Sequence, residues 1–479
     1  MIERLQVTHL RNISRADLRF ASCNVLIGEN GSGKTSLLEG LFLLSRGKSF
    51  RHHQPKRYIQ HHQPSVTIHA TFYDGVTVAI QKQLDATTAL RLNQDTIYTQ
   101  STLTQQLPTL LIDPSSMDML EQGSASRRQL LDWLAFHMKP GFHAQWLAYQ
   151  RLLKQRNRLL KQSRQLTLIQ HQELSAWDTG LAHHAALIHH YRQQVFEAWQ
   201  PYFERCVTAL LPKYSGKLSL SYLPGYDSEL GLQEQLKARL SQDLQQGFTR
   251  MGSHRADIQV HWRSHGLSEK SSINKEVEGS EGANADRAMT DTHDSDYSDI
   301  DDADIESRGN DDFDDDFDEA SKDFEPLKEQ AANVLSRGEK KLLITALKLS
   351  QLPLLLTETA FEPPASATTS TYSETISAAT TTVSAASTSD TFSNTAHIDS
   401  SPSDSHYKTI SQSHAPAVLL DDITAELDSR AIEVLLATLS ALPCQVFITS
   451  LTEDIVPELK KYWPDFNLFH VKHGEITSL

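Results

Sequence analysis

Residues 28–35 read GENGSGKT and match the phosphate-loop pattern GxxxxGK[ST], which constrains the fold more than any other feature of this chain. Glycines let the backbone wrap phosphate groups with its N–H donors, and the following helix adds the positive end of its dipole. The apolar run 24–27 before the loop predicts a buried strand, and a helix is expected from Lys34 to about Leu44. This is the context that a phosphate loop requires. The alternative is a glycine turn that only caps a helix.

We expect nine consecutive residues of this loop to contact ATP. Lys34 would reach the β- and γ-phosphates, and the hydroxyl of Thr35 would ligate Mg²⁺. The loop therefore predicts ATP and Mg²⁺ as cofactors, with an ATP-binding set of Gly28, Glu29, Asn30, Gly31, Ser32, Gly33, Lys34, Thr35 and Ser36.

A second candidate segment, AVLLDD at 417–422, places two acids after four apolar residues. This pattern is typical of a buried strand that delivers carboxylates to a metal ion. Asp421 would hold the Mg²⁺, directly or through water, and Asp422 would orient or deprotonate the attacking water. Lys34 and Asp422 are thus the candidate catalytic pair. A strand that simply ends in an acidic helix cap is the alternative.

The segment LSRGEKK at 335–341 resembles the LSGGQ-type signature of ABC-family ATPases. That resemblance implies that Ser336, Arg337, Gly338 and Glu339 bind the γ-phosphate of the ATP held by a second subunit, in an ATP-dependent homodimer. Asp428 would then match the D-loop beside the dimer interface. Ser336 and Glu339 also form an ordinary capping box, and Asp428 an ordinary helix cap. The nucleotide-binding interpretation and the helix-capping interpretation both stay open.

Charge is distributed unevenly along the chain. The whole chain has a net charge of −15, but residues 276–325 hold 21 Asp/Glu and 3 Lys/Arg, so everything else carries about +3. A second unusual stretch, 364–413, contains 25 Ser or Thr among 50 residues. Such compositions offer little to bury, and we interpret both as disordered insertions. The acidic one is either a solvated spacer or a regulatory element that competes with nucleic acid for a basic surface.

The remaining patterns predict an α/β fold, an ABC-type P-loop ATPase head with an inserted helical arm subdomain and the two disordered insertions. Short strands at 2–8 and 17–20, antiparallel strands at 65–73 and 76–84, and a strand–helix–strand ending support the head. Pro140 and Pro201 are expected to break or kink the helical region. The expected divisions are 1–122 and 329–479 for the head, joined by 212–265, with 123–211 as the arm, 266–328 as the acidic insertion and 358–415 as the Ser/Thr-rich insertion.

Composition excludes several classes of protein. No run approaches the length of about 18 apolar residues that a membrane helix needs. The first residues lack the apolar stretch of a secretory signal. Cys23, Cys206 and Cys444 lie far apart without a CxxC pair, which suggests neither a disulfide framework nor a zinc site. These observations favour a cytoplasmic protein with no membrane partner.

Beyond the ATPase motifs, the chain resembles the RecF family of bacterial recombination and gap-repair ATPases, which is related to SMC proteins. The resemblance covers most of 1–265 and 329–479, and departs from the usual pattern at Ala125, Leu130 and Ser253. The motifs that carry it are HLRNI within 2–20, GSASRRQLLDWLAF (123–136), QRNRLLK (155–161), GSHRADI (252–258), LSRGEKK and LLDDITAELD.

The resemblance implies an ATP-dependent dimer that binds double-stranded and gapped DNA and acts with RecO and RecR to load RecA at single-strand gaps. It also implies roles in DNA replication, DNA damage repair and the SOS response, with weak, DNA-dependent ATP hydrolysis as a switch. Basic residues of the arm are candidates for phosphate contacts. An ordinary solvated basic face explains them equally well. Those chosen as DNA-binding are Arg127, Arg128, Arg156, Arg158 and Lys161, from a cluster that also includes Arg151, Lys154 and Arg164.

Three other functions share these motifs. A transporter nucleotide-binding subunit normally has its first two motifs far closer together than the roughly 300 residues between Lys34 and Ser336. A long-armed SMC or zinc-hook ATPase needs a much longer arm than the ~60 Å that about 85 helical residues give as a hairpin, so only a short-armed SMC-like protein stays an alternative from this class. A nucleotide-gated interaction protein that does not hydrolyse ATP fits every residue discussed, with Asp422 idle.

Overall fold

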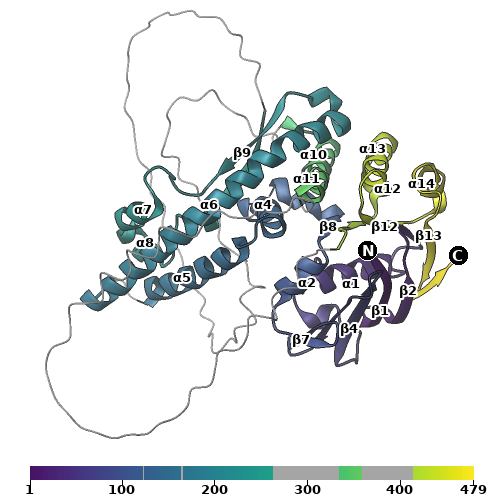
Figure 1. Ribbon diagram of the computed structural model, residues 1–479, viewed down its shortest axis with the longest axis horizontal. Helices are drawn as coiled ribbons and strands as arrows, with labels where there is room; N and C mark the ends of the chain where they lie inside the picture. The colour runs from purple at the N-terminus through teal and green to yellow at the C-terminus, as the bar shows by residue number, and fades with distance from the viewer. Residues whose placement is uncertain (122, 163–164, 263–333, 359–413) are drawn as a thin grey trace, which may run out of the picture.

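The computed structural model describes residues 1–121, 123–162, 165–262, 334–358 and 414–479 (Figure 1). The predicted acidic insertion, 266–328, lies outside the described residues. The predicted Ser/Thr-rich insertion, 358–415, lies outside them except at its two ends. Among the described helices, none is long and apolar enough to cross a lipid bilayer.

The phosphate loop follows a central strand of a six-stranded sheet, whose order is β14-β13-β3-β12-β11-β8. β13, β3, β12, β11 and β8 pair in parallel, and β14 closes one edge in antiparallel fashion. Because every residue of β3, β11 and β12 is buried, near-continuous apolar sequence is what these strands require. Their bounds are β3 Cys23–Ile27, β8 Thr109–Ile112, β11 Ala417–Leu420, β12 Gln445–Ser450, β13 Asn467–Lys472 and β14 Glu475–Ser478.

A second, antiparallel sheet has the order β2-β1-β4-β5-β6-β7. Helix α1, Lys34–Arg46, contacts strands of both sheets, so the phosphate-loop helix lies in the core between them. The alternating burial of β4 confirms the pattern expected at 65–73. The strands are β1 Ile2–Leu10, β2 Ile13–Arg19, β4 Ser65–Phe72, β5 Thr77–Gln83, β6 Thr88–Leu92 and β7 Asp95–Ile97.

The helical arm extends away from the two sheets (Figure 1). It contains α4 Ser124–Met138, α5 Phe142–Gln162 and α6 Leu168–Leu210, and α5 packs along α6. The predicted break at Pro140 is confirmed, since Pro140 lies between α4 and α5. Of the two outcomes expected at Pro201, a break does not occur, because α6 continues through this residue. Trp199 and Phe203 are fully buried on either side of this proline, and their packing offsets the roughly 3 kcal/mol that a proline costs inside a helix.

The signature helix α10, Arg337–Leu349, and the following α11, Gln351–Glu358, pack against the second half of α6. A two-stranded sheet of β9 Leu218–Leu223 and β10 Asp257–Trp262 packs against α6 through β9 and against α4 through β10. The remaining helices are α2 Gln100–Gln106, α3 Asp118–Glu121, α7 Leu232–Ala238, α8 Leu240–Gln246, α12 Ile423–Glu426, α13 Ser429–Ser440 and α14 Val456–Tyr462. The short 3₁₀ turns are η1 Pro55–Arg57, η2 Pro114–Met117, η3 Pro212–Tyr214, η4 Ser253–Arg255 and η6 Glu453–Ile455.

Candidate ATP-binding site

The phosphate loop connects β3 to α1 at the carboxyl edge of the parallel sheet. Gly33 has φ 121°, a conformation that L side chains rarely adopt. A Cβ on Gly28 would lie 2.2 Å from the carbonyl oxygen of Val471, so only glycine fits there. Lys34 is buried in the loop, where its Nζ donates to the carbonyls of Gly28 at 2.6 Å and Glu29 at 3.0 Å. Burial lowers the pKa of Lys34, and Asp422 and Asp421 partly oppose that shift.

Asn12, in the turn between β1 and β2, supports this loop from outside. Its Nδ2 donates to the carbonyls of Ser32 at 2.8 Å and Gly31 at 3.3 Å, and its Oδ1 accepts from the Ser36 hydroxyl at 3.2 Å. Asn12 was not among the predicted site residues, although the HLRNI motif contains it. The backbone N–H of Gly474 also donates to Ser32, at 2.8 Å, so two turns distant in sequence shape the loop.

Asp421 meets the phosphate loop directly. The Thr35 hydroxyl donates to Asp421 Oδ1 at 2.9 Å, although 386 residues separate the two in sequence. Thr449 is on β12, the strand between β3 and β11, and donates to the same oxygen at 2.8 Å. Burial raises the pKa of Asp421, and these two hydroxyls oppose the shift. The structure therefore brings together the two residues predicted to hold Mg²⁺, and Thr449 joins them as a residue that the sequence did not suggest.

Asp422 has a left-handed backbone, with φ 52° and ψ 38°, and its N–H donates to the Thr449 hydroxyl at 2.8 Å. Within the described residues, its Oδ1 is buried and has no hydrogen-bond partner. A buried carboxylate oxygen without a donor is costly unless a cation or water satisfies it. With Thr35 and Asp421 adjacent, the residues present fit a hard divalent cation, which prefers oxygen ligands.

The signature turn, residues 335–341, begins α10. Ser336 is its N-cap, and Ser336 and Glu339 form a complete capping box. Ser336, Arg337 and Gly338 are exposed to solvent, and nothing within 4 Å would meet a Cβ on Gly338. The capping interpretation is therefore confirmed, while the same turn remains free to meet another molecule. Asp428 likewise caps α13, because its Oδ1 accepts from the Ala431 N–H at 2.8 Å.

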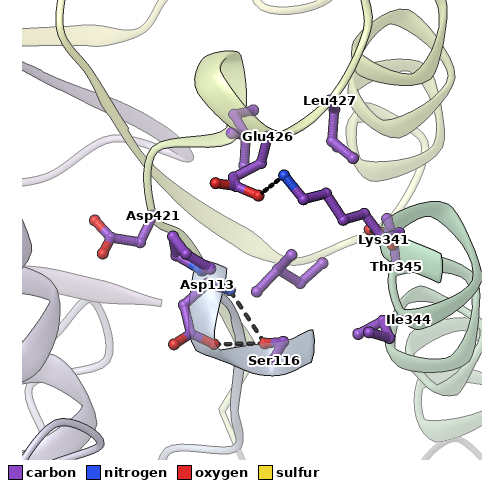
Figure 2. Close-up of a pocket in the computed structure, with 11 residues that line it drawn as sticks. Asp113, Ser116, Lys341, Ile344, Thr345, Asp421, Glu426 and Leu427 are labelled. Carbon is purple, nitrogen blue, oxygen red and sulfur yellow. Dashed lines mark hydrogen bonds and ion pairs between the residues drawn. The ribbon is translucent and has the colours of Figure 1, made fainter. Parts of the chain in front are cut away.

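A pocket separates α10 from the ends of β8 and β11 (Figure 2). Lys341 on α10 forms an ion pair with Glu426 on α12, across the pocket from Asp113 and Asp421. Two helical turns further along α10, the Nζ of Lys348 donates to Leu111 O at 2.7 Å and to the Ser116 hydroxyl at 2.5 Å. Burial lowers the pKa of Lys348 to about 8. The signature helix thus contacts β8 through Lys348 and α12 through Lys341, and Asp421 lies between these two segments in the pocket.

Three of the five arginines and lysines predicted to bind DNA are occupied inside the protein. Arg127 forms a bidentate ion pair with Asp257 at 2.9 and 3.0 Å, and the buried Arg128 donates to Ala256 O at 2.9 Å. Arg156 is fully buried and contacts Asp178 and Asp243, each at 2.7 Å. Arg156 is unavailable to phosphate in this arrangement, because it is fully desolvated and held by two carboxylates. Arg127 and Arg128 are already engaged with Asp257 and the Ala256 carbonyl. Arg158 and Lys161 are exposed on α5, while Arg164 lies outside the described residues.

The GSHR segment completes the same internal network. His254 Nε2 contacts the Thr249 carbonyl at 3.0 Å, which requires a proton on Nε2, so Nδ1 accepts from the Tyr149 hydroxyl at 2.7 Å. Arg192 donates to Ser253 O and forms an ion pair with Asp132, both at 2.7 Å. Residues of the motifs at 123–136, 155–161 and 252–258 therefore join the helices of the arm to one another and to the chain around residues 243–257.

The fold and site define the class of this protein. A phosphate loop after the central parallel strand, an aspartate from a strand two positions away and an inserted helical arm are those of an ABC-type P-loop ATPase head. The family model described as RecF/RecN/SMC N terminal domain matches residues 1–360. This match, together with a RecF relative that is 32% identical over the full chain, shows that the chain belongs to the RecF family.

Individual relatives agree with this assignment. A DNA replication and repair protein RecF from Acinetobacter baylyi is 32% identical and covers 100% of this chain and 99% of its own length. Its counterpart from Coxiella burnetii is 28% identical, with coverages of 99% and 98%. The solved structure of the recombination mediator protein RecF with ATP in the RecFOR pathway has a TM-score of 0.65 at 18% identity, covering 100% of this chain and 97% of that one. That likeness shows a shared fold.

Proposed function

We propose that this protein is an ATP-dependent DNA-binding protein of recombinational gap repair and replication restart. It dimerises on ATP, acts with RecO and RecR to load RecA at single-strand gaps, and uses weak ATP hydrolysis as a release switch. The observation that carries the ATP-binding part is the contact between Thr35 and Asp421 at the edge of the parallel sheet. The names of the relatives support the repair role and the partners.

The residues of the site divide the chemistry among them. Thr35 and Asp421 would hold Mg²⁺, which supplies charge neutralisation on the phosphates. The loop amides and Lys34 bind the phosphates, and Asp422 orients the attacking water or accepts its proton. Most ABC ATPases have a longer glutamate at this position. An aspartate reaches less far, which favours slow turnover.

Dimerisation is supported by the exposure of the signature turn within one chain. In Figure 1, α1 lies between the sheets, whereas α10 packs against α6 and borders the parallel sheet at β8. The exposed residues Ser336 and Gly338 begin α10, and a helix N-terminus favours bound anion. A second protomer brings its own phosphate loop to this turn, so that two ATP molecules lie between the two subunits.

Duplex DNA fits the exposed face of α5. Arg151, Lys154, Arg158 and Lys161 are exposed and follow one another by three or four residues, which places them along one side of the helix. No Asp or Glu occurs within α5. We call these four residues the basic stripe. The stripe spans about 15 Å at 1.5 Å per residue, which suits contacts with a few successive phosphates.

Sedimentation of the protein with ATP, with ADP, and with ATP plus gapped duplex DNA tests the proposal. We expect a dimer with ATP, tightened by the DNA, and a monomer with ADP. Lys34→Ala and Ser336→Arg should each remain folded monomers with ATP, because each removes a phosphate contact without touching the core. A parent protein that stays monomeric with ATP contradicts the proposed dimer with ATP bound between its subunits.

Mixing the two variants distinguishes binding in trans from binding in cis. A heterodimer of Lys34→Ala and Ser336→Arg keeps one intact site, formed by the Ser336→Arg protomer's phosphate loop and the other protomer's signature turn. The mixture should therefore dimerise on ATP at lower protein concentration than either variant alone. No gain on mixing would mean that the signature turn does not act across an interface.

Hydrolysis is tested separately by Asp422→Asn. If Asp422 activates water, turnover falls by 10²-fold or more, within the range typical of a lost general base, while ATP-dependent dimerisation persists. Equal, negligible rates for Asp422→Asn and the parent protein would instead support a nucleotide-gated protein that does not hydrolyse ATP.

A further inference from the structure

The end of the arm helix touches the signature turn through one carboxylate. After α6 ends at Leu210, η3 places the Tyr214 hydroxyl 2.6 Å from Glu339 Oε1, to which it donates. The other oxygen, Glu339 Oε2, accepts from the Ser336 N–H at 2.9 Å. Glu339 therefore connects the arm to the backbone of the turn that begins α10. The Nζ of Lys213 lies 3.6 Å from the same carboxylate.

Both sides of this connection are held firmly. Tyr214 is buried and packs edge-on against Trp262 of β10, with the ring centroids 5.6 Å apart. At the other end of α10, the buried Trp199 of α6 donates to the Ser350 hydroxyl at 2.8 Å. The Tyr214 hydrogen bond and the Ser336 amide lower the pKa of Glu339 to about 2, so the carboxylate is ionised at neutral pH and both hydrogen bonds are charge-assisted.

The arm has a continuous path to this contact. α6 has 43 residues, a length of about 65 Å, and leads through Leu211 directly into η3. α5, which carries the basic stripe, is attached to α6 by the buried Arg156–Asp178 pair. Packed helix therefore joins α5 to Tyr214 without interruption.

We infer that Tyr214 is a positioning residue through which the arm orients the signature turn, so that duplex DNA on the arm alters ATP-dependent dimerisation. This inference rests on the proposed function. Tyr214 belongs neither to the phosphate loop nor to the basic stripe, and acts through Glu339. Removing its hydroxyl leaves the capping box complete, because Ser336 contacts the other carboxylate oxygen.

The test compares Tyr214→Phe with the parent protein in three measurements. ATP binding to the monomer, measured with a fluorescent ATP analogue at low protein concentration, should not change, since the phosphate loop is intact. ATP-dependent dimerisation should weaken about tenfold, as expected for losing a hydrogen bond to a charged group. The tightening of the dimer by gapped duplex DNA should fall to less than a third of its parent value. Tyr202→Phe is the matched control. Among the described residues, its hydroxyl contacts Thr357 on α11, at 3.4 Å, and not the signature turn.

A double-mutant cycle shows whether Tyr214 acts through Glu339. In a Glu339→Ala background, Tyr214→Phe should have no further effect on dimerisation. Unchanged DNA tightening in Tyr214→Phe overturns the inference, as does a joint loss of ATP binding and thermal stability, which indicates a merely structural role. If the parent protein itself does not dimerise on ATP, the proposed function fails first and this inference fails with it.

Discussion

At the residue scale, the geometry of the nucleotide site depends on side chains outside the phosphate loop. Asn12 binds two carbonyls of the loop and the Ser36 hydroxyl, and Thr449 holds both the Asp421 carboxylate and the Asp422 N–H. Each fixes the orientation of a group that is predicted to bind phosphate or Mg²⁺. A site whose groups are oriented in advance needs less reorganisation when the ligand binds.

Asn12→Ala should therefore weaken ATP binding without unfolding the protein. Losing the neutral hydrogen bonds that hold the loop is expected to reduce ATP affinity about tenfold, a total loss of about 1.4 kcal/mol. Isothermal titration with ATP and Mg²⁺ measures the change. Gln60→Ala is a suitable control, because Gln60 contacts Ser14 near the same turn but not the loop. Equal affinity for Asn12→Ala and the control would exclude this support role.

His254 predicts a pH dependence of stability. Burial lowers its folded pKa to about 3 from an ordinary value of 6.5, so its contribution is complete above pH 6.5 and is lost as the pH falls toward 3. Between pH 7 and pH 5 this group alone removes about 2 kcal/mol from the free energy of unfolding. Urea unfolding at both values should show that His254→Gln loses about that much less stability on acidification than the parent protein. An identical loss would mean that His254 is not buried in its neutral form.

At the scale of elements, α5 shows how neighbouring arginines take opposite roles. Arg156 faces α6 and α8, where it is fully buried between Asp178 and Asp243, while Arg158, two residues later, is exposed. Two residues rotate the side chain by about 200° around a helix, from the packed face to the solvent face. The basic residues of the arm are thus two groups, one that assembles the arm and one that is free to bind phosphate.

Substituting these two arginines should separate stability from DNA binding. Arg156→Ala leaves two buried aspartates without their cation and is expected to lower the free energy of unfolding by about 3–5 kcal/mol. Arg158→Ala should change the free energy of unfolding by less than about 0.5 kcal/mol. It should weaken duplex binding and make the salt dependence of that binding shallower by roughly one phosphate contact. Chemical denaturation and DNA titrations at several salt concentrations measure both effects. If Arg158→Ala binds DNA like the parent protein, the basic stripe is not the DNA surface.

At the scale of the whole molecule, net charge is misleading about partners. The −15 of the chain arises from residues 276–325, and the remainder is slightly basic. These residues lie outside the described structure, so the prediction for them rests on charge alone. If it is not simply a spacer, an acidic run on the same chain as a basic stripe would compete with DNA at a high effective concentration.

Deleting residues 276–325 should strengthen duplex binding at low salt if the acidic run competes with DNA. The gain should shrink as the salt concentration rises, because screening weakens the competition. Fluorescence anisotropy with a labelled duplex at low and high salt measures it. Replacing the same residues with a neutral linker of equal length controls for the shortened connection. Unchanged affinity would identify the segment as a spacer.

Much of the fold and the ATP site followed from local sequence. The phosphate loop, the strand before it, the strand carrying Asp421 and Asp422, and the helix at Ser336 all lie where their patterns predicted. Each is encoded within a few consecutive residues, because glycine conformations, caps and apolar runs act over one turn or one strand. The RecF family assignment rested on the same local motifs and is confirmed by the full-length relatives.

The tertiary structure alone decided which charged and polar side chains are available. Nothing local in sequence distinguishes Arg156 from Arg158, joins Asn12 to Ser32, or brings Tyr214 to Glu339 across 125 residues. Nor did the sequence show that Trp199 and Phe203 would carry α6 through Pro201. Burial and pairing depend on which distant elements pack together, and the resulting free energies, from desolvation and from core packing, exceed local propensities. The sequence by itself therefore determined the motifs of an ATPase, and packing determined which residues surround, support and connect them.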